Sequence, residues 1–366
     1  MSVKLTSIIA YLENLAPVSL QESYDNSGLL IGSPEQMVNK ALITLDVTPE
    51  VIEEAVAHGC DLIIAHHPLI FKGLKRITGS SEVETCVIEA IRNHLAIYAI
   101  HTNLDNITSG VNSQLARKLD LINTRILAPK TGSLKKIVTF CPTEYAHKVR
   151  MALFDAGGGH IGNYSHCSFN QTGEGTFMGL ENSQPFVGEK EKLHTEAETR
   201  IETIVPSFRV NAVINAMLKA HPYEEVAYNI YPLENIYTAI GSGMIGTLEE
   251  PMPPLEFLNK IKKNLGCQHI KHNQLIPREV QTVAICGGSG SFLTEAAFRA
   301  KADVFVTADV KYHEFFEHRG KMTIVDAGHF ETEQGTKELL ESLLTKNFPN
   351  FALRISKKNI NPVSFL

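Results

Sequence analysis

Short apolar strands alternate with amphipathic helices over the first third of this 366-residue chain. Apolar runs at 41–46 and 61–68 flank a segment with helical spacing at 48–59. A second helix is predicted over 81–94, and an apolar strand then leads to Asp105. Strands joined by helices in this way are typical of a layered α/β fold.

The same order of elements returns near the C-terminal end. A strand at 282–290 is followed by a helix, by a strand that begins at Asp303 and by an apolar run that leads to Glu333. The piece DLIIAHH aligns with DVFVTAD, which indicates an internal repeat. We therefore predict two related α/β lobes, 1–130 and 238–366, and expect the second lobe to complete the site of the first.

The segment 131–237 has a different pattern. Its predicted order is β-α-β-β-β-α-β, with helices at 144–157 and 208–221. This order resembles the two βαβ halves of a ferredoxin-like domain, with one extra hairpin strand. The termini of such a unit lie close together, so it is readily inserted into another domain. We expect an inserted ferredoxin-like α+β domain between the two lobes.

Composition and charge give no support for several classes of protein. The formal net charge is −6, and no basic cluster indicates a nucleic-acid partner. No apolar stretch approaches the ~18 residues that cross a membrane, and the N-terminal segment lacks the apolar region of a signal peptide. The six cysteines are scattered without a C-x-x-C pair, which indicates reduced thiols. We expect a cytoplasmic protein with no membrane partner.

Metal-ligating side chains follow the predicted strands. Ligands in open α/β sheets bind beyond the carboxyl ends of the strands. His66, His67, Asp105 and His329 each follow an apolar strand, and Glu333 lies four residues beyond His329. On a helix, a spacing of four places both side chains on one face. We predict that these five residues form one metal site.

The donor types suggest which ions bind. Imidazole and carboxylate groups suit zinc, iron, manganese or nickel, and a carboxylate can bridge two ions about 3.5–4 Å apart. Five donors for two ions leave positions open for water or substrate, as in catalytic sites. We predict two divalent ions per chain, with zinc as the first choice. The division of the ligands stays open, except that Glu333 is expected to bridge the ions.

Other polar residues near this site carry weaker signals. His101 and His313 are candidate catalytic residues. His101 either orients a ligand or satisfies a buried strand end, and His313 is either a general acid or base or a solvated histidine. The glycine run 287–290 could cradle a phosphate, although a tight turn explains it equally well. The segment 24–28 is predicted to be an ordinary turn.

Six pieces of the sequence carry a resemblance to a known family. They are SYDNSGLLIG, DLIIAHHPLIFKG, AIHTNLD, AICGGSG, DVFVTADVKYHE and DAGHFETE. Together they resemble the GTP cyclohydrolase 1 type 2 homolog family, also called the NIF-three-like family, over residues 1–128 and 240–366. The resemblance implies a NIF-three-like fold and a dimetal site whose ligands map by motif onto the same five residues. Through HPYEEVAY, GNYSHCSF and GEGTF, the middle segment resembles the PII- or CutA-like domain inserted in longer bacterial members.

The resemblance also implies an assembly and an activity. The resemblance implies a toroidal homohexamer, with metal sites that face its internal cavity. The family name implies opening of the guanine ring of GTP. One hypothesis is therefore a dinuclear metal-dependent hydrolase that attacks a nucleotide or related heterocycle with metal-activated water. The alternative is a non-enzymatic metal-handling or regulatory protein whose insert binds an effector, so whether the chain is an enzyme stays open.

Overall fold

The computed structural model describes residues 2–358 and 360–366 and divides them into two compact units. The first unit runs to Pro129 and resumes at Thr238, and the second unit is Lys130–Tyr237. The two ends of the first unit meet in one sheet, where Pro129 pairs with Gly241. The second unit is therefore an insertion between adjacent points of the first.

One sheet of the first unit has five strands in the order β17-β4-β5-β6-β2. They are β17 (Ala352–Ile355), β4 (Lys40–Thr44), β5 (Leu62–Ala65), β6 (Ala96–Ala99) and β2 (Gly28–Ile31). The first four run parallel and β2 runs antiparallel to β6. Helices α2 (Pro49–Ala57) and α3 (Glu82–Arg92) bury Val51 and Val87 against Leu42, Ile63 and Ile97 of this sheet. Helix α11 (Thr336–Asn347) contacts β17 and β4.

The other sheet of the first unit has six strands in the order β13-β16-β15-β14-β12-β7. They are β13 (Lys271–His272), β16 (Thr323–Asp326), β15 (Val304–Ala308), β14 (Val280–Ser289), β12 (Gly241–Met252) and β7 (Ile122–Pro129). The central β14, β15 and β16 are parallel. Val304 packs with α5 (Val111–Lys118) and α8 (Pro254–Leu265), whereas Phe305 packs with α9 (Thr294–Arg299). Helices therefore cover both faces, which explains the continuous apolar runs of these strands.

The two sheets do not follow the lobe boundaries expected from the sequence. Strand β7 precedes the insert but belongs to the second sheet, and β17 lies near the C-terminus but pairs with β4 of the first sheet. Each sheet therefore contains a strand from the opposite end of the chain. A short hairpin of β1 (Val3–Lys4) and β3 (Met37–Val38) and the helix α1 (Leu5–Leu15) complete the N-terminal part.

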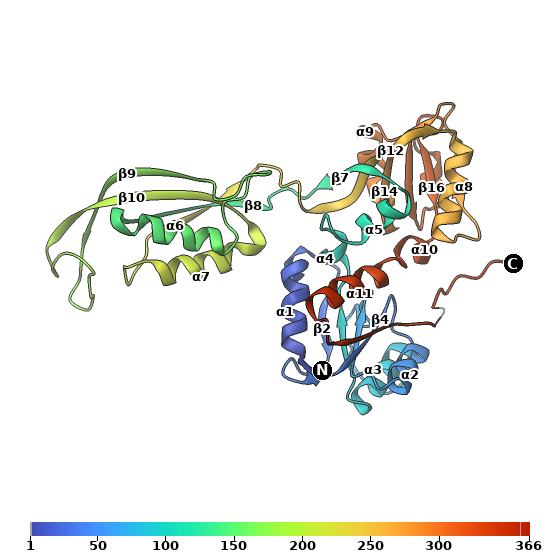
Figure 1. The fold of residues 1–366 in the computed structure, drawn as a ribbon, viewed down its shortest axis with the longest axis horizontal. Helices are drawn as coiled ribbons and strands as arrows, with labels where there is room; N and C mark the ends of the chain where they lie inside the picture. Colours follow the sequence, from blue (N-terminus) through green and yellow to red (C-terminus); the bar gives the residue numbers. More distant parts are fainter. Residues whose placement is uncertain (1, 359) are drawn as a thin grey trace. The chain divides into compact units, whose positions relative to one another are not determined.

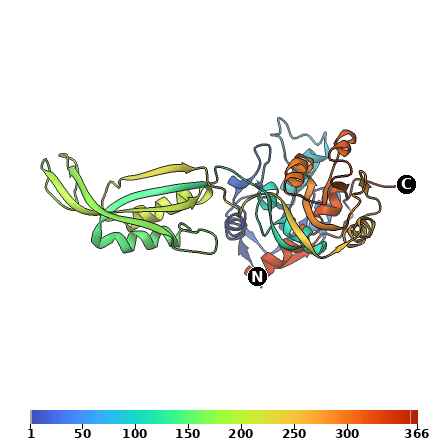
Figure 2. The same ribbon diagram turned by 90° about the horizontal axis from the view of Figure 1, so that it is seen from above.

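The second unit is a four-stranded antiparallel sheet in the order β11-β8-β10-β9. Its elements along the chain are β8 (Leu134–Pro142), α6 (Ala146–Asp155), β9 (Ser168–Met178), β10 (Leu193–Pro206), α7 (Val210–Ala220) and β11 (Tyr228–Leu233). The order β-α-β-β-α-β is that of a ferredoxin-like unit. Helices α6 and α7 lie on the same face of the sheet (Figures 1 and 2). The extra hairpin strand expected from the sequence is wrong, because residues 168–178 form one continuous strand.

These observations confirm the predicted α/β class of the chain. The strands predicted over 41–46, 61–68 and 282–290 are β4, β5 and β14, each somewhat shifted or shorter at its ends. All six cysteines are free thiols. Within the described residues, no helix is both long enough and apolar enough to pass through a membrane.

Candidate metal centre

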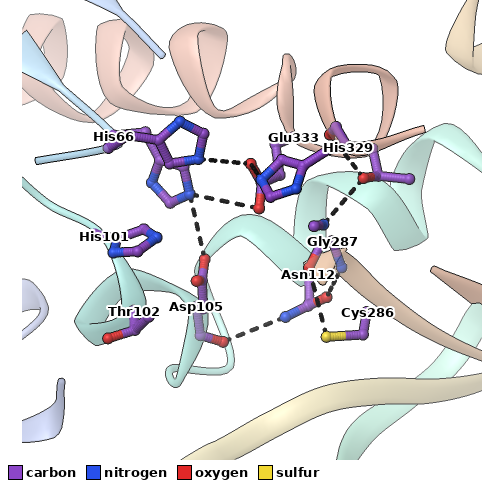
Figure 3. A network of polar contacts seen from close by, with 12 residues as sticks. His66, His101, Thr102, Asp105, Asn112, Cys286, Gly287, His329 and Glu333 are labelled. Atoms are coloured by element: carbon purple, nitrogen blue, oxygen red, sulfur yellow. Dashed lines mark hydrogen bonds and ion pairs between the residues drawn. The ribbon is translucent and has the colours of Figure 1, made fainter. Parts of the chain in front are cut away.

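Two short helices and one strand end bring the five predicted ligands together. His66 and His67 directly follow β5, so neither is constrained by the alternation of a strand. Asp105 is the last residue of α4 (Thr102–Asp105), which follows β6, rather than part of the strand itself. His329 and Glu333 are the first and last residues of α10 (His329–Glu333). Figure 3 shows the rings of His66 and His329 beside the Glu333 carboxylate, with Asp105 near His66.

The Glu333 carboxylate lies at the centre of the cluster and is buried. Its Oε2 atom is 2.9 Å from Nε2 of His67 and 3.0 Å from Nε2 of His329. Its Oε1 atom faces Nε2 of His66 at 3.9 Å, and the same nitrogen is 3.6 Å from Oδ1 of Asp105. The two oxygens of one carboxylate therefore face two different groups of ligands.

The Nδ1 atom of each of the three imidazoles is hydrogen-bonded to another residue of the chain. In every ring Nδ1–H donates to an oxygen, and Nε2 is thereby turned toward Glu333. The acceptors are the Ile100 carbonyl at 2.8 Å from His66, Asp46 Oδ1 at 2.7 Å from His67 and Asp309 Oδ2 at 2.7 Å from His329. Metal-binding histidines are oriented in this way, by a carboxylate or carbonyl on the nitrogen that does not bind the ion.

Two buried polar atoms of the cluster support the binding of a cation. Within the described residues, Nε2 of His66 and Oδ1 of Asp105 are buried and have no hydrogen-bond partner. A buried polar atom without a partner costs about 1–3 kcal/mol. Both atoms are lone-pair donors that face the same space beside Glu333, so a cation there would satisfy both. The residues present therefore fit a metal ion.

The electrostatics of the cluster also favour positive charge. Burial by itself would lower the pKa of His67, but hydrogen bonds to Asp46 and Glu333 raise it to about 10. Burial would also lower the pKa of His329, but Glu333 and Asp309 raise it to about 9. Burial, together with the charge of Glu333, raises the pKa of Asp105 to about 6. The carboxylates thus hold protons on two imidazoles at neutral pH, at the nitrogen atoms that a metal ion would occupy.

His101 lies beside the cluster. Its ring centroid lies 5.2 Å from that of His66 and 5.3 Å from that of His67. One ring nitrogen each of His66, His67 and His101 lies within 4.8 Å of the others, a spacing that could hold an ion. His101 Nδ1–H donates to Asp25 Oδ1 at 2.8 Å. Because Nδ1 is engaged by Asp25, Nε2 is the ring nitrogen of His101 that could act on a ligand in the cleft.

Asp25 is a site residue that sequence reasoning missed, because it was assigned to an ordinary turn. Its side chain is buried, and besides His101 it accepts hydrogen bonds from the hydroxyl and backbone N–H of Thr102. Burial would raise the pKa of this carboxyl, but the bonds from His101 and Thr102 hold it well below its usual range. Residues 25 and 101 are distant in sequence. The signal that could have pointed to Asp25 was its place in SYDNSGLLIG, one of the pieces that carry the family resemblance.

The structure does not bring His313 to this cluster. His313 is exposed on the short helix η5 (Tyr312–Phe316), where its ring contacts Tyr312 and Phe316. The solvated histidine, which was the alternative interpretation, describes this position better. Within the described residues, His313 is not among those that line the cleft around Glu333.

The glycine run 287–290 is not an open phosphate cradle. Gly287 and Gly288 belong to β14, and their N–H groups donate to Oδ1 of Asn112 and to the hydroxyl of Thr332, both at 3.0 Å. Gly288 has φ +61, and a Cβ atom there would lie 2.2 Å from Oε1 of Glu333. The glycine therefore leaves room for the central carboxylate.

Asn112, which the sequence did not single out, also donates to the carbonyl of Asp105 at 3.3 Å and so connects β14 with α4.

The cluster opens into a cavity of about 700 Å³. Such a volume suits a small organic ligand. Aromatic side chains line it beside the polar cluster, among them Tyr24, Phe71, Phe292 and Phe330. The cavity therefore combines flat apolar walls with one end rich in imidazole and carboxylate groups.

Comparison with known proteins places this chain in a family. The sequence profile of the family described as Duf34/NIF3 (NGG1p interacting factor 3) matches residues 3–362. A protein of Halalkalibacterium halodurans named "GTP cyclohydrolase 1 type 2 homolog" is 41% identical, with 98% of each chain covered. One of the same name from Bacillus subtilis is 39% identical and covers 100% of this chain and 99% of its own.

A solved structure agrees with these sequence matches. The crystal structure of a Bacillus cereus protein related to NIF3 is similar with a TM-score of 0.85 and 40% sequence identity, and 98% of both chains is covered. The match therefore includes both units of the chain. The chain belongs to the Duf34/NIF3 family, whose relatives carry the name GTP cyclohydrolase 1 type 2 homolog.

Proposed function

We propose that this chain is a dinuclear metal-dependent hydrolase, similar to a GTP cyclohydrolase, that acts on a nucleotide or a related heterocycle. The observation that carries the proposal is the convergence of three Nε2 atoms on the buried Glu333 carboxylate, each ring being tethered through Nδ1. Membership of a family named after a cyclohydrolase supports the reaction class.

The distances suggest how the ligands would divide between two ions. His66 and Asp105 would hold one ion together with Oε1 of Glu333, because these atoms face one another at 3.6 and 3.9 Å. His67 and His329 would hold the other together with Oε2. Glu333 would then bridge the pair. Zinc suits these donors best, with iron, manganese or nickel as alternatives.

The remaining side chains would handle the substrate and its protons. Bound ions of this kind lower the pKa of a coordinated water toward about 7 and polarise the bond under attack. His101 would accept or deliver a proton through Nε2, because Asp25 fixes its Nδ1. Tyr24, Phe71 and Phe330 would stack against or enclose a planar heterocycle in the cavity.

Further properties follow from the resemblance of the chain to its family. We infer a homohexameric ring in the cytoplasm and assign the insert to the PII- or CutA-like type, which its ferredoxin-like order of elements supports. Light scattering during size-exclusion chromatography measures the first property directly. A mass near that of one or two chains would contradict the ring.

Turnover separates the enzyme from a metal-handling or regulatory protein. Purified chain reloaded with Zn²⁺ or Mn²⁺ is incubated with GTP, and products are separated by chromatography. We expect metal-dependent product that Glu333→Ala abolishes and that Glu338→Ala, a change at an exposed position of α11, leaves intact. If metal is bound and exchanges but neither GTP nor other nucleotides are consumed, the hydrolase proposal is wrong and the metal-handling alternative is favoured.

A further inference from the structure

The insert has a cavity of its own, on the face of its sheet that α6 and α7 leave open. Cys141 and Ile201 pack against these helices, so their strand neighbours Phe140 and Arg200 point to the opposite face. The cavity there has a volume of about 850 Å³, within the range of small-molecule sites. Two sequence pieces that carried the family resemblance, GEGTF (173–177) and half of HPYEEVAY (221–228), lie along it.

Aromatic rings form part of the wall. The ring centroid of Tyr223 lies 5.9 Å from that of Phe177 and 6.3 Å from that of Phe186. Tyr223 is fixed through its backbone, because its N–H donates to Nδ1 of His221 at 3.1 Å. Nε2–H of His221 in turn donates to the carbonyl of Phe140 at 2.8 Å. These bonds and the place of Phe177 on β9 fix two of the rings, and Phe186 contacts Tyr223 from the loop between β9 and β10.

One carboxylate is built into the wall beside these rings. Glu198 Oε1 accepts a hydrogen bond from the Tyr223 hydroxyl at 2.9 Å. A Cβ atom at position 175 would lie 2.2 Å from Oε2 of Glu198, so Gly175 leaves the space in which this carboxylate lies. Burial and the bond to Glu198 raise the pKa of Tyr223, so the hydroxyl remains a donor. Glu198 thus presents a fixed negative charge next to aromatic faces.

The charge of the lining is strongly unbalanced. The carboxylates of the lining are Glu174, Glu198, Glu224 and Glu225. The single guanidinium of the lining, Arg200, donates to Glu202 at 2.9 Å, and Glu202 also pairs with Lys136 at 3.2 Å. The lining itself therefore has four carboxylates against one guanidinium. A cation over aromatic rings is attracted by the ring quadrupoles, in addition to its attraction to carboxylates. Such a lining selects a ligand with positive charge.

The arrangement of donors suits an organic cation better than a metal ion. Within the described residues, two groups of three or more His, Cys, Asp or Glu side chains have ligand atoms within 4.8 Å of one another, and both groups belong to the first unit. Among the described residues of the insert, no three such side chains therefore lie close enough together to surround one small ion. A larger cation with an apolar body would contact both the rings and Glu198.

We propose that this cavity binds an organic ammonium ion with an aromatic or aliphatic body. The ammonium group pairs with Glu198, and Phe177, Phe186 and Tyr223 enclose the body. The inference does not depend on the metal centre or on its reaction. It gives the insert a ligand of defined chemical class.

Calorimetric titration of the full-length chain with benzyltrimethylammonium tests this proposal. We expect saturable binding that Glu198→Gln weakens about tenfold or more, because the amide keeps the bond to Tyr223 but removes the charge. Glu144→Gln removes the same charge from an exposed helix of the insert and serves as the matched control, with unchanged binding.

Comparison of ligands on the unaltered chain keeps the test independent of how the variants fold. Phenylacetate has a ring of the same kind with the opposite charge, and we expect it not to bind. Tighter binding of phenylacetate than of benzyltrimethylammonium would overturn the proposal. So would the absence of saturable cation binding at millimolar concentration, or equal affinity of the wild type and a folded Glu198→Gln variant.

Discussion

Replacement of Asp25 by Asn tests whether the buried carboxylate organises the cluster through His101. Asp25 accepts hydrogen bonds from Nδ1–H of His101 at 2.8 Å, from the N–H of Thr102 at 3.0 Å and from the N–H of Asn26 at 2.6 Å, besides the Thr102 hydroxyl. An asparagine amide has only one oxygen, so its NH₂ group must face at least one of these donors. Loss of one hydrogen bond to a buried charged group costs about 1.5–3 kcal/mol.

We therefore expect Asp25→Asn to lower the free energy of unfolding of the first unit by about 2–3 kcal/mol at pH 7. Urea unfolding followed by circular dichroism measures this quantity if the transitions of the two units are fitted separately. Asp155→Asn makes the same substitution at an exposed position and should change little. A loss below about 0.5 kcal/mol in Asp25→Asn would refute the reasoning, since exposed positions give changes of that size.

Three further changes have distinct expected results. Gly288→Ala should weaken metal binding by roughly 10–100-fold in chelator competition, because its Cβ displaces Glu333, whereas Gly73→Ala, in open space, should not. Glu84→Gln should lower the melting temperature at pH 7 and by less at pH 3. Hydrogen bonds from the preceding loop lower the pKa of Glu84 to about 2, so its stabilisation is present above the unfolded-state pKa and is lost as the pH falls toward 2. Replacement of 130–237 by a short glycine-serine linker should leave the metal content unchanged, since the ends of the first unit already pair; loss of metal would contradict this.

The parallel strands of the first unit were predictable because burial on both faces gives them continuous apolar runs. Strands β4, β5 and β14 were found in this way. Strand β7 was not assigned to the second sheet, because its first four residues, Ile122–Arg125, are exposed and give no sign of their partner. In the insert, residues 168–178 were divided between two predicted strands, yet antiparallel pairing with β10 carries the backbone through as one.

Within the site, the sequence predicts ligand types better than their supports. The strand-end positions of His66 and His67 and the spacing from His329 to Glu333 were enough to suggest one cluster, and the structure brings these residues together. The groups that fix the rings are harder to foresee. Asp25 reaches His101 across 76 positions of the chain, and no local pattern encodes that contact.

Metal content is the most direct measurement of the central claim. Purified chain is reconstituted with zinc, freed of excess ion and analysed by mass spectrometry for metal per chain, beside Glu333→Ala and Glu338→Ala. The arrangement around Glu333 predicts about two ions per chain in the wild type and in Glu338→Ala, with at most one in Glu333→Ala, since the bridging carboxylate is lost. Absence of bound metal from the folded wild type, or an unchanged content in Glu333→Ala, would contradict it.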